Sequence, residues 1–270
     1  MKRDDVKRQR KYGSLLMAML LVPLAVPAWA QDKVPTLSSP AGAAGQAAGE
    51  ISAQVNGPLT CNLWNQPQSI VNTNAYASQD FTDFDVYDIF LADDFTNKVA
   101  WQIDTFFVPG GLWNGATTLA NADNLVFAIY RDNGGKPDGD PKGGGEPPVW
   151  SLAVPPADSR ITIETDLFGT QGNVTLALES PVSLQPGTYW LIFYPQMEFT
   201  SYGQYGRNVA DTANLANAQV INPGGGFGYV PTSWGDASVL GMSQHDLAFC
   251  LQGKEGFPWP MFLPEITKEK

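Results

Sequence analysis

Aspartates are the side chains in this sequence most able to do chemistry, and they gather in two stretches. Six carboxylates lie within residues 80–94, and four more oxygen-bearing side chains lie within 132–140. Hard oxygen ligands on loops are what Ca²⁺ requires, although neither stretch has EF-hand spacing. We predict a structural calcium site at Asp93, Asp94 and Asp246, with turn-forming or solvated aspartates as the alternative. The other members are Asp80, Asp83, Asp85, Asp88, Asp132, Asn133, Asp138 and Asp140.

Acid–base or nucleophilic catalysis has few candidates. A Ser–His–acid triad needs a histidine, and His245 is the only one in the chain, with no GxSxG motif before it. Asp246 follows it directly, so on a strand the two side chains point to opposite faces. We therefore predict a protein that is not an enzyme. The alternative is a polysaccharide hydrolase in which Glu164 and Glu179 act as paired carboxylates about 5 to 10 Å apart.

Aromatic residues in glycine-rich or polar loops are candidates for binding sugars. Trp113 lies in PGGLWNG and Trp234 in PTSWGDAS, while Tyr202, Tyr205 and Tyr229 have similar polar surroundings. A flat ring can stack on the apolar face of a sugar while neighbouring polar groups bind its hydroxyls. We predict a glycan-binding surface at Trp113, Trp234, Tyr202 and Tyr205. The alternative is that these rings cap the ends of a hydrophobic core.

Residues 1–30 have the three parts of a cleavable secretory signal. An apolar run over 15–27 follows a basic start, and Ala28-Trp29-Ala30 offers the small residues that a signal peptidase reads. Two prolines interrupt the run, and it is shorter than the ~20 apolar residues that span a bilayer. We therefore predict export to the periplasm, the cell surface or the medium, with no membrane insertion after cleavage. The basic residues are Lys2, Arg3, Lys7, Arg8, Arg10 and Lys11.

The charge balance of the exported part narrows its partners. The whole chain has 16 Lys+Arg and 27 Asp+Glu, and residues 1–30 contain 6 and 2 of these, so 10 and 25 remain and the net charge is -15. Binding nucleic acid or an anionic membrane requires clustered Lys and Arg, so we expect neither as a partner. We expect the partner to be a glycan, or a protein of the cell surface or matrix.

Cys61 and Cys250 are the only cysteines, one near each end of the region expected to fold. An even count in an oxidising compartment predicts a disulfide, with two buried thiols as the alternative. The bridge would close a loop of about 190 residues, for which the chain-entropy model gives at most roughly 5 kcal/mol.

The pattern of apolar residues predicts an all-β fold in one domain. Residues 31–54 are rich in Ala, Gly, Ser and Pro and indicate a flexible leader, whereas 254–270 form a proline-broken tail. Between them, over 55–253, short alternating runs are separated by Gly, Pro, Asn and Asp, which indicates a two-layer antiparallel β-sandwich resembling a jelly roll. Glycine and proline in 131–148 predict a long hairpin excursion. The expected strands lie within 99–107, 124–132, 161–168, 173–180, 187–195 and 245–253.

Four segments carry a family resemblance: LADDFT, FAIYRDNGGKPDG, SLQPGTYWLIF and HDLAFCLQG. In this order, over residues 90–253, they resemble secreted bacterial β-sandwich modules of exported and surface proteins, which often stand beside PEP-CTERM-type sorting tails. The resemblance implies a sandwich, export and a surface or matrix role, and no catalytic residue carries over. The chain lacks the apolar anchor and basic terminus of such a tail. We expect a non-enzymatic recognition module or, alternatively, a self-assembling envelope component.

Overall fold

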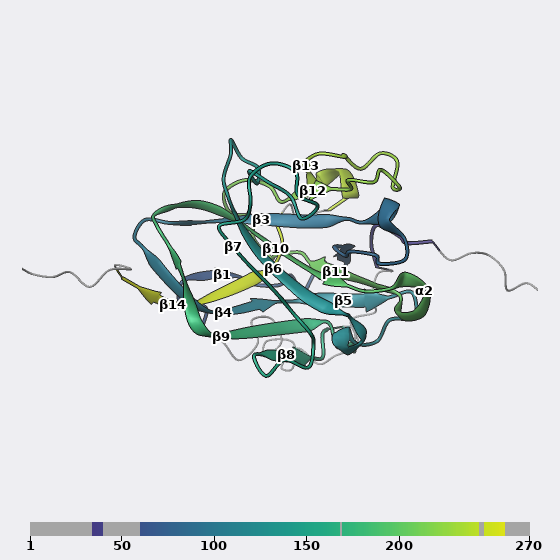
Figure 1. The fold of residues 1–270 in the computed structure, drawn as a ribbon, viewed down its shortest axis with the longest axis horizontal. Coiled ribbons are helices and arrows are strands. Elements are labelled where there is room, and N and C mark those ends of the chain that lie inside the picture. Colours follow the sequence, from purple (N-terminus) through teal and green to yellow (C-terminus); the bar gives the residue numbers. More distant parts are fainter. Residues whose placement is uncertain (1–33, 40–59, 168, 243–245, 257–270) are drawn as a thin grey trace, which may run out of the picture. The chain divides into compact units, whose positions relative to one another are not determined.

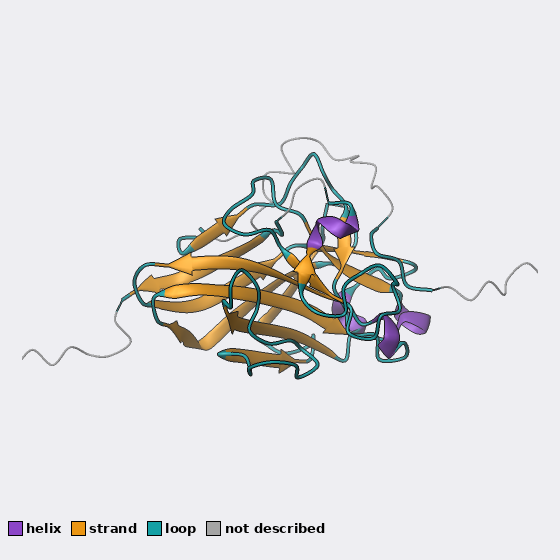
Figure 2. Ribbon diagram, turned by 90° about the horizontal axis from the view of Figure 1, so that it is seen from above, coloured by secondary structure: helices purple, strands orange, loops and turns teal. Residues whose placement is uncertain are grey.

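A computed structural model describes residues 34–39, 60–167, 169–242 and 246–256 (Figure 1). These residues form three antiparallel sheets that are not closed into a barrel, so the predicted all-β sandwich is confirmed. The helical segments are short and connect strands (Figure 2). They are η1 (Asp85–Tyr87), η2 (Leu119–Asn121), α2 (Phe199–Tyr202) and η3 (Ala237–Leu240). The expected signal segment 1–30, most of the leader, His245 and the tail beyond Gly256 lie outside the described residues.

One layer of the sandwich is a five-stranded sheet with the order β1-β14-β4-β9-β8. Its longest strands, β4 and β9, pair over most of their length, with a register shift between Ile103 and Thr105. The alternating runs in the sequence correctly predict β4, β8, β9 and β14. The strands are β1 (Trp64–Gln66), β4 (Trp101–Val108), β8 (Ile161–Glu164), β9 (Asn173–Leu184) and β14 (Phe249–Glu255).

The second layer is a six-stranded sheet with the order β13-β12-β3-β10-β6-β7. Its strand β10 is apolar on both faces and buried along most of its length, as predicted for a fully covered strand. The strands are β3 (Phe90–Asn97), β6 (Asn124–Arg131), β7 (Trp150–Val154), β10 (Gly187–Gln196), β12 (Gln219–Ile221) and β13 (Gly235–Asp236).

A third, smaller sheet has the order β2-β11-β5 and was not expected from the sequence. Its strands are β2 (Ala75–Ala77), β5 (Gly110–Trp113) and β11 (Gln204–Asn208). Glycines allow the close strand approach here, since a Cβ on Gly206 would lie 2.4 Å from the carbonyl oxygen of Tyr76.

The main core lies between the five- and six-stranded sheets. Phe106 of β4 packs on Phe127 of β6, and Phe127 packs on Phe193 of β10, with ring centroids 6.0 and 4.6 Å apart. The Cys61–Cys250 disulfide predicted from the sequence is present and joins the segment before β1 to β14. No helix in the described ranges is long and apolar enough to cross a membrane.

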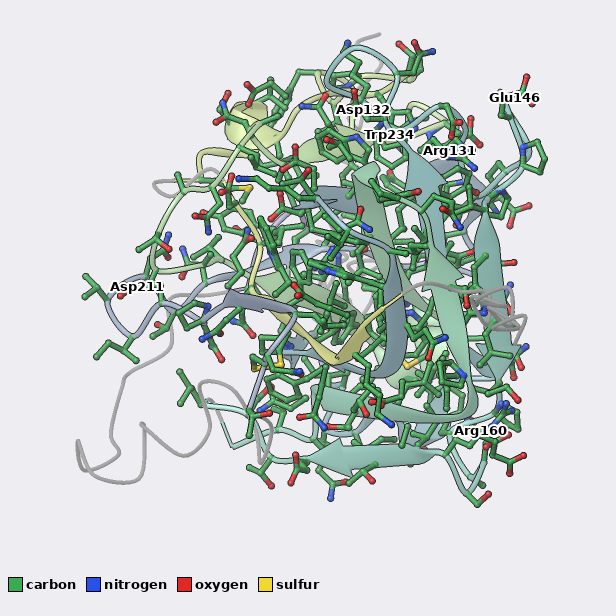
Figure 3. The ribbon with its side chains drawn as sticks, turned by 90° about the vertical axis from the view of Figure 1, so that its left-hand side faces the viewer. Arg131, Asp132, Glu146, Arg160, Asp211 and Trp234 are labelled. Atoms are coloured by element: carbon green, nitrogen blue, oxygen red, sulfur yellow. A yellow bond between two sulfur atoms is a disulfide. The ribbon has the colours of Figure 1, made fainter. Side chains whose placement is uncertain are left out.

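The opposite face of the six-stranded sheet is also apolar and is covered by connections. Trp190 and Ile192 of β10 lie on this outer face, and Trp234 packs with them. The Trp234 indole Nε1 donates to the carbonyl oxygen of Gly139 (2.8 Å), and Lys136 Nζ donates to the Trp234 carbonyl (2.9 Å). These contacts hold the long loop 131–148, which joins β6 to β7, close to Trp234 (Figure 3).

Candidate functional site

A pocket of about 470 Å³ lies between the loop 131–148 and the outer face of the six-stranded sheet. We call it the loop pocket. Its floor comes from three neighbouring strands and its walls from the loop. The lining residues are Val126, Ala128, Tyr130, Asp140, Pro141, Gly143, Gly145, Glu146, Pro147, Pro148, Ser151 and Tyr194.

Strand register builds the floor. Val126, Ala128 and Tyr130 are alternate residues of β6, so their side chains share one face of the sheet. Tyr194 of β10 stands opposite Val126, and Ser151 of β7 stands opposite Ala128. Side chains from three neighbouring strands therefore lie together on one patch of the sheet.

Two tyrosines, Tyr130 and Tyr194, belong to the floor of the pocket. Both residues are buried, and within the described part of the chain neither hydroxyl has a hydrogen-bond partner. Burial, together with the charges of Asp140 and Asp138, raises the pKa of Tyr130 to about 12. Burial and the nearby Asp80 likewise raise the pKa of Tyr194. Both phenols are therefore neutral hydrogen-bond donors at physiological pH.

Hydrogen bonds and glycines within the loop 131–148 shape the wall of the loop pocket. Asp140 Oδ1 accepts hydrogen bonds from the backbone N–H groups of Lys142 (2.8 Å) and Gly144 (3.2 Å). Gly145 has φ of +75°, and a Cβ there would lie 2.3 Å from the carbonyl oxygen of Asp138. The aspartate and glycines that predicted an irregular excursion thus fold a compact wall that returns toward the sheet.

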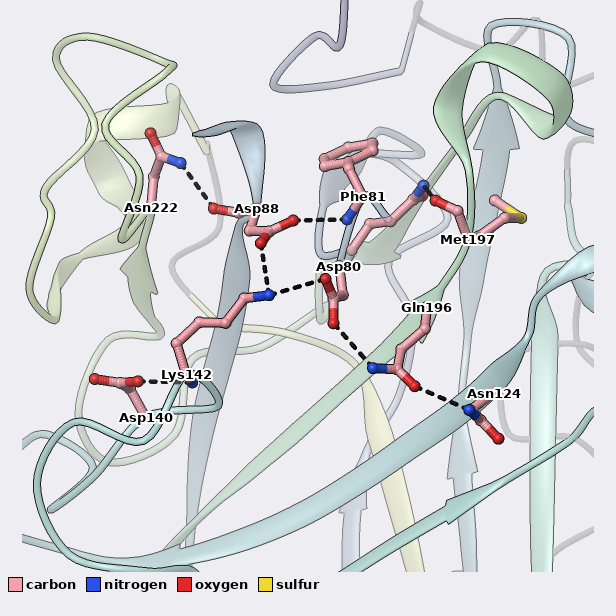
Figure 4. A network of polar contacts seen from close by, with 10 residues as sticks. Asp80, Phe81, Asp88, Asn124, Asp140, Lys142, Gln196, Met197 and Asn222 are labelled. Atoms are coloured by element: carbon pink, nitrogen blue, oxygen red, sulfur yellow. Dashed lines mark hydrogen bonds and ion pairs between the residues drawn. The ribbon is translucent and has the colours of Figure 1, made fainter. Parts of the chain in front are cut away.

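Lys142 fastens this wall to a distant segment (Figure 4). Its Nζ lies 2.7 Å from Asp88 Oδ2 and 3.0 Å from Asp80 Oδ1. Asp88 Oδ1 also accepts from the Phe81 N–H (2.7 Å), and Asp80 Oδ2 accepts from Gln196 Nε2 (3.0 Å). Burial raises the pKa of Asp88 to about 6, although Lys142 acts to lower it.

The predicted calcium ligands Asp93, Asp94 and Asp246 are brought together by the fold. Asp93 and Asp94 lie in the middle of β3, not in a loop as a calcium site would favour. Burial and the charge of Asp246 raise the pKa of Asp93 well above its ordinary value, and burial with the charges of Asp246 and Asp132 raises that of Asp94 to about 7.

Hydrogen-bond donors surround these carboxylates. Asp93 Oδ2 accepts from Gln66 Nε2 (2.7 Å) and from the Leu247 N–H (2.5 Å). The N–H groups of Asn214 and Ala216 donate to Asp246 and Asp94 respectively. The cluster thus ties connecting segments to β3. No group of three or more His, Cys, Asp or Glu side chains in the described ranges is arranged to hold a metal ion, and calcium stays a prediction.

Arg207 of β11 is a buried charge that sequence reasoning missed. Its Nη1 donates to the carbonyl oxygens of Leu91 (3.4 Å) and Leu191 (3.2 Å), while Nε and Nη2 have no partner in the described structure. Burial lowers its pKa to about 10, against the opposite influence of Asp93. The sequence signal for it is weak, since QYGRN does not resemble a buried strand.

The predicted sugar-binding aromatics do not form one surface. Trp113 is 6% exposed and its Nε1 donates to Thr36 Oγ1 (2.8 Å), whereas Trp234 is 9% exposed and contacts the long loop. Tyr205 is fully buried, and Tyr202 is 40% exposed. The ring faces of Trp113, Trp234 and Tyr205 are therefore covered in this structure.

The glutamates of the alternative hydrolase hypothesis, Glu164 and Glu179, are also separated. Glu164 of β8 stands opposite Asn173, near the start of β9, whereas Glu179 lies six residues further along β9. At ~3.4 Å per residue this places Glu179 roughly 20 Å from the Glu164 position. The pair is therefore wider than the carboxylate spacing of glycosidases.

Comparison with protein-family models, with curated proteins and with solved structures finds no match to this chain. The loop pocket and its polar groups are thus the basis for a functional assignment.

Proposed function

We propose that this chain is an exported, non-enzymatic recognition module that binds a hydroxyl-rich ligand, such as a glycan segment, in the loop pocket. The observation that carries the proposal is the pair of unpartnered hydroxyls of Tyr130 and Tyr194 in the floor of a pocket of about 470 Å³. This volume lies in the ~300–1,000 Å³ range of small-molecule sites.

The chemistry of the lining favours a neutral polyol. The tyrosine hydroxyls can donate to and accept from sugar hydroxyls, and the carboxylates of Asp140 and Glu146 can accept from them. Val126, Ala128 and the prolines provide apolar surface for C–H faces. Among the described residues, the lining contains acids and no Lys or Arg, which disfavours anionic ligands.

Export is supported by independent features. The Cys61–Cys250 disulfide is typical of oxidising compartments. The first thirty residues carry the basic, apolar and small-residue parts of a secretory signal. The acidic composition favours a soluble state outside the cell.

A glycan array probed with the purified protein, followed by calorimetry on the best-bound oligosaccharide, tests the proposal. Tyr130→Phe and Tyr194→Phe each remove one hydroxyl and should weaken binding by about three- to tenfold. Tyr229→Phe, outside the pocket and outside the predicted surface, is the matched control and should bind as wild type does. Absence of glycan binding, or equal affinities for all four proteins, would overturn the assignment.

A carboxylate-dependent polysaccharide hydrolase is the second candidate, because Asp140 and Glu146 both line the loop pocket. Two carboxyl groups on one ligand site are the minimum for glycoside hydrolysis. Release of reducing ends that is abolished by Glu146→Gln, yet unchanged by the control Glu164→Gln, would establish it. Binding without turnover would reject it and retain the recognition module.

A further inference from the structure

We infer that Lys142, Asp80 and Asp88 form an acid-released latch that holds residues 140–148 closed over the loop pocket. The proposal rests on the proposed function only for the identity of the ligand that would enter the pocket. The latch itself is defined by contacts on both sides of the pocket wall.

The wall has one polar attachment beyond its own loop. Lys142 Nζ contacts Asp80 and Asp88, which lie 62 and 54 positions away in the sequence. Within the described structure, every other hydrogen bond of 140–148 stays inside the loop 131–148. The earlier part of the loop is fastened separately, through Asp132 to Trp190 and through Gly139 to Trp234.

The latch stands beside the pocket. Asp140, Pro141 and Gly143 line the pocket on either side of Lys142 in the sequence. Release of Lys142 would therefore free this part of the wall while the Trp190 and Trp234 contacts keep the first half of the loop in place. Opening is thus a local hinge motion that leaves the sheet intact.

Proton uptake favours the open form. Lys142 Nζ lies 2.7 Å from Asp88 Oδ2 and acts to lower the pKa of Asp88, so a proton on Asp88 removes an attraction that holds the closed form. The neutral acid attracts the Lys142 ammonium group less than the carboxylate does, and acid therefore shifts the balance toward release.

The charged groups facing Asp88 are few. Asp80 raises its pKa and Lys142 lowers it, while the phenol of Tyr194 is neutral. Asp83, on the same segment, accepts from the N–H groups of Phe199 and Thr200 and so points toward α2. Asp88 is thus the group whose titration near pH 6 acts on the latch.

Hydrogen–deuterium exchange of the purified protein at pH 7.5 and pH 5.0, converted to protection factors, tests the latch without any ligand. Peptides covering 140–148 should lose protection by roughly three- to tenfold at pH 5.0, the change that one pKa unit of coupling permits. Lys142→Met should show the low protection at both pH values. Asp88→Asn, which mimics the protonated acid, should do the same.

Asp158→Asn provides the matched control, because Asp158 forms an exposed ion pair with Arg160 far from the loop. Its loop peptides should behave as those of wild type. Protection that does not change with pH in wild type, or that survives in Lys142→Met, would overturn the latch. Lys142 is half-exposed, so Lys142→Met is expected to fold. It therefore tests the latch even if Asp88→Asn does not fold. Failure of glycan binding alone leaves this result unaffected.

Discussion

Asp93 and Arg207 are fully buried side chains of opposite charge, and each shifts the pKa of the other across the interior of the sandwich. Burial opposes the charge of both, and their mutual attraction partly offsets it. Removing one member leaves the other in a medium where an unpaired charge is costly.

Arg207→Met should therefore lower the free energy of unfolding by about 1–3 kcal/mol near pH 8, because the hydrogen bonds to the carbonyls of Leu91 and Leu191 are lost as well. The loss should shrink at pH 5, because Asp93 can then take up a proton in the folded state. Urea denaturation of Arg207→Met, Asp93→Asn and the double variant measures this coupling. The double variant should be less destabilised than the sum of the single variants, and strict additivity would contradict the coupling.

Asp94 should make the protein less stable as the pH rises. Its pKa is about 7 in the folded protein and near 3.8 in the unfolded chain, so the folded state binds more protons between these values. Its stabilising contribution is present at low pH and is lost as the pH rises through about 7. Urea midpoints at pH 5 and pH 8 should differ less in Asp94→Asn than in wild type. Asp158→Asn is the control, since the pKa of Asp158 is lowered to about 2 and lies outside this window.

Gly145→Ala should disrupt the pocket wall more than Gly143→Ala does. Both glycines have positive φ, so both substitutions carry the backbone cost of about 1 kcal/mol. Only at Gly145 does the added Cβ meet backbone, 2.3 Å from Asp138 O, whereas nothing lies within 4 Å at Gly143. Loop protection in hydrogen exchange should fall for Gly145→Ala alone. Equal effects of the two substitutions would show that the close approach is unimportant.

Reduction of the disulfide should lower the free energy of unfolding by about 2–5 kcal/mol, because it releases a loop spanning 189 residues. Equilibrium denaturation with and without a reductant measures the difference. The double variant Cys61→Ser/Cys250→Ser should match the reduced wild type and should not respond to the reductant. A reductant effect on the double variant would point to another cause.

The strands that the sequence predicts are those with alternating apolar and polar residues, together with β10, whose residues are apolar on both faces. Leu125, Phe127 and Ile129 face the core from β6 as their spacing indicates. The strand β3 was missed because Asp93 and Asp94 break its apolar pattern, and the side chain of Gln66 and the backbone of Leu247, both distant in sequence, donate to Asp93. Part of what supports this strand therefore comes from distant parts of the chain, which a local sequence pattern does not reveal.

The candidate site was less predictable than the fold. The calcium site at Asp93, Asp94 and Asp246 stays a prediction, and the sequence predicts the loop 131–148 as a hairpin excursion that carries acids but does not predict the pocket beside it. Its position depends on Lys136 reaching Trp234, 98 residues away, and on Lys142 reaching Asp80. Such contacts leave no periodic signal in a sequence. The floor tyrosines were hidden for a related reason, because Tyr130 and Tyr194 lie in runs that look entirely like core strands.

The Cys61–Cys250 bond also gives the chain the topology of a closed ring over the 189 positions that it spans. The loop 131–148 lies inside that ring. A protease that cuts this loop once would open the ring yet release no fragment, because the two pieces stay covalently joined through the sulfurs. In an environment that contains proteases, the chain could be cut within the loop 131–148 and its two pieces would still form one covalently joined molecule.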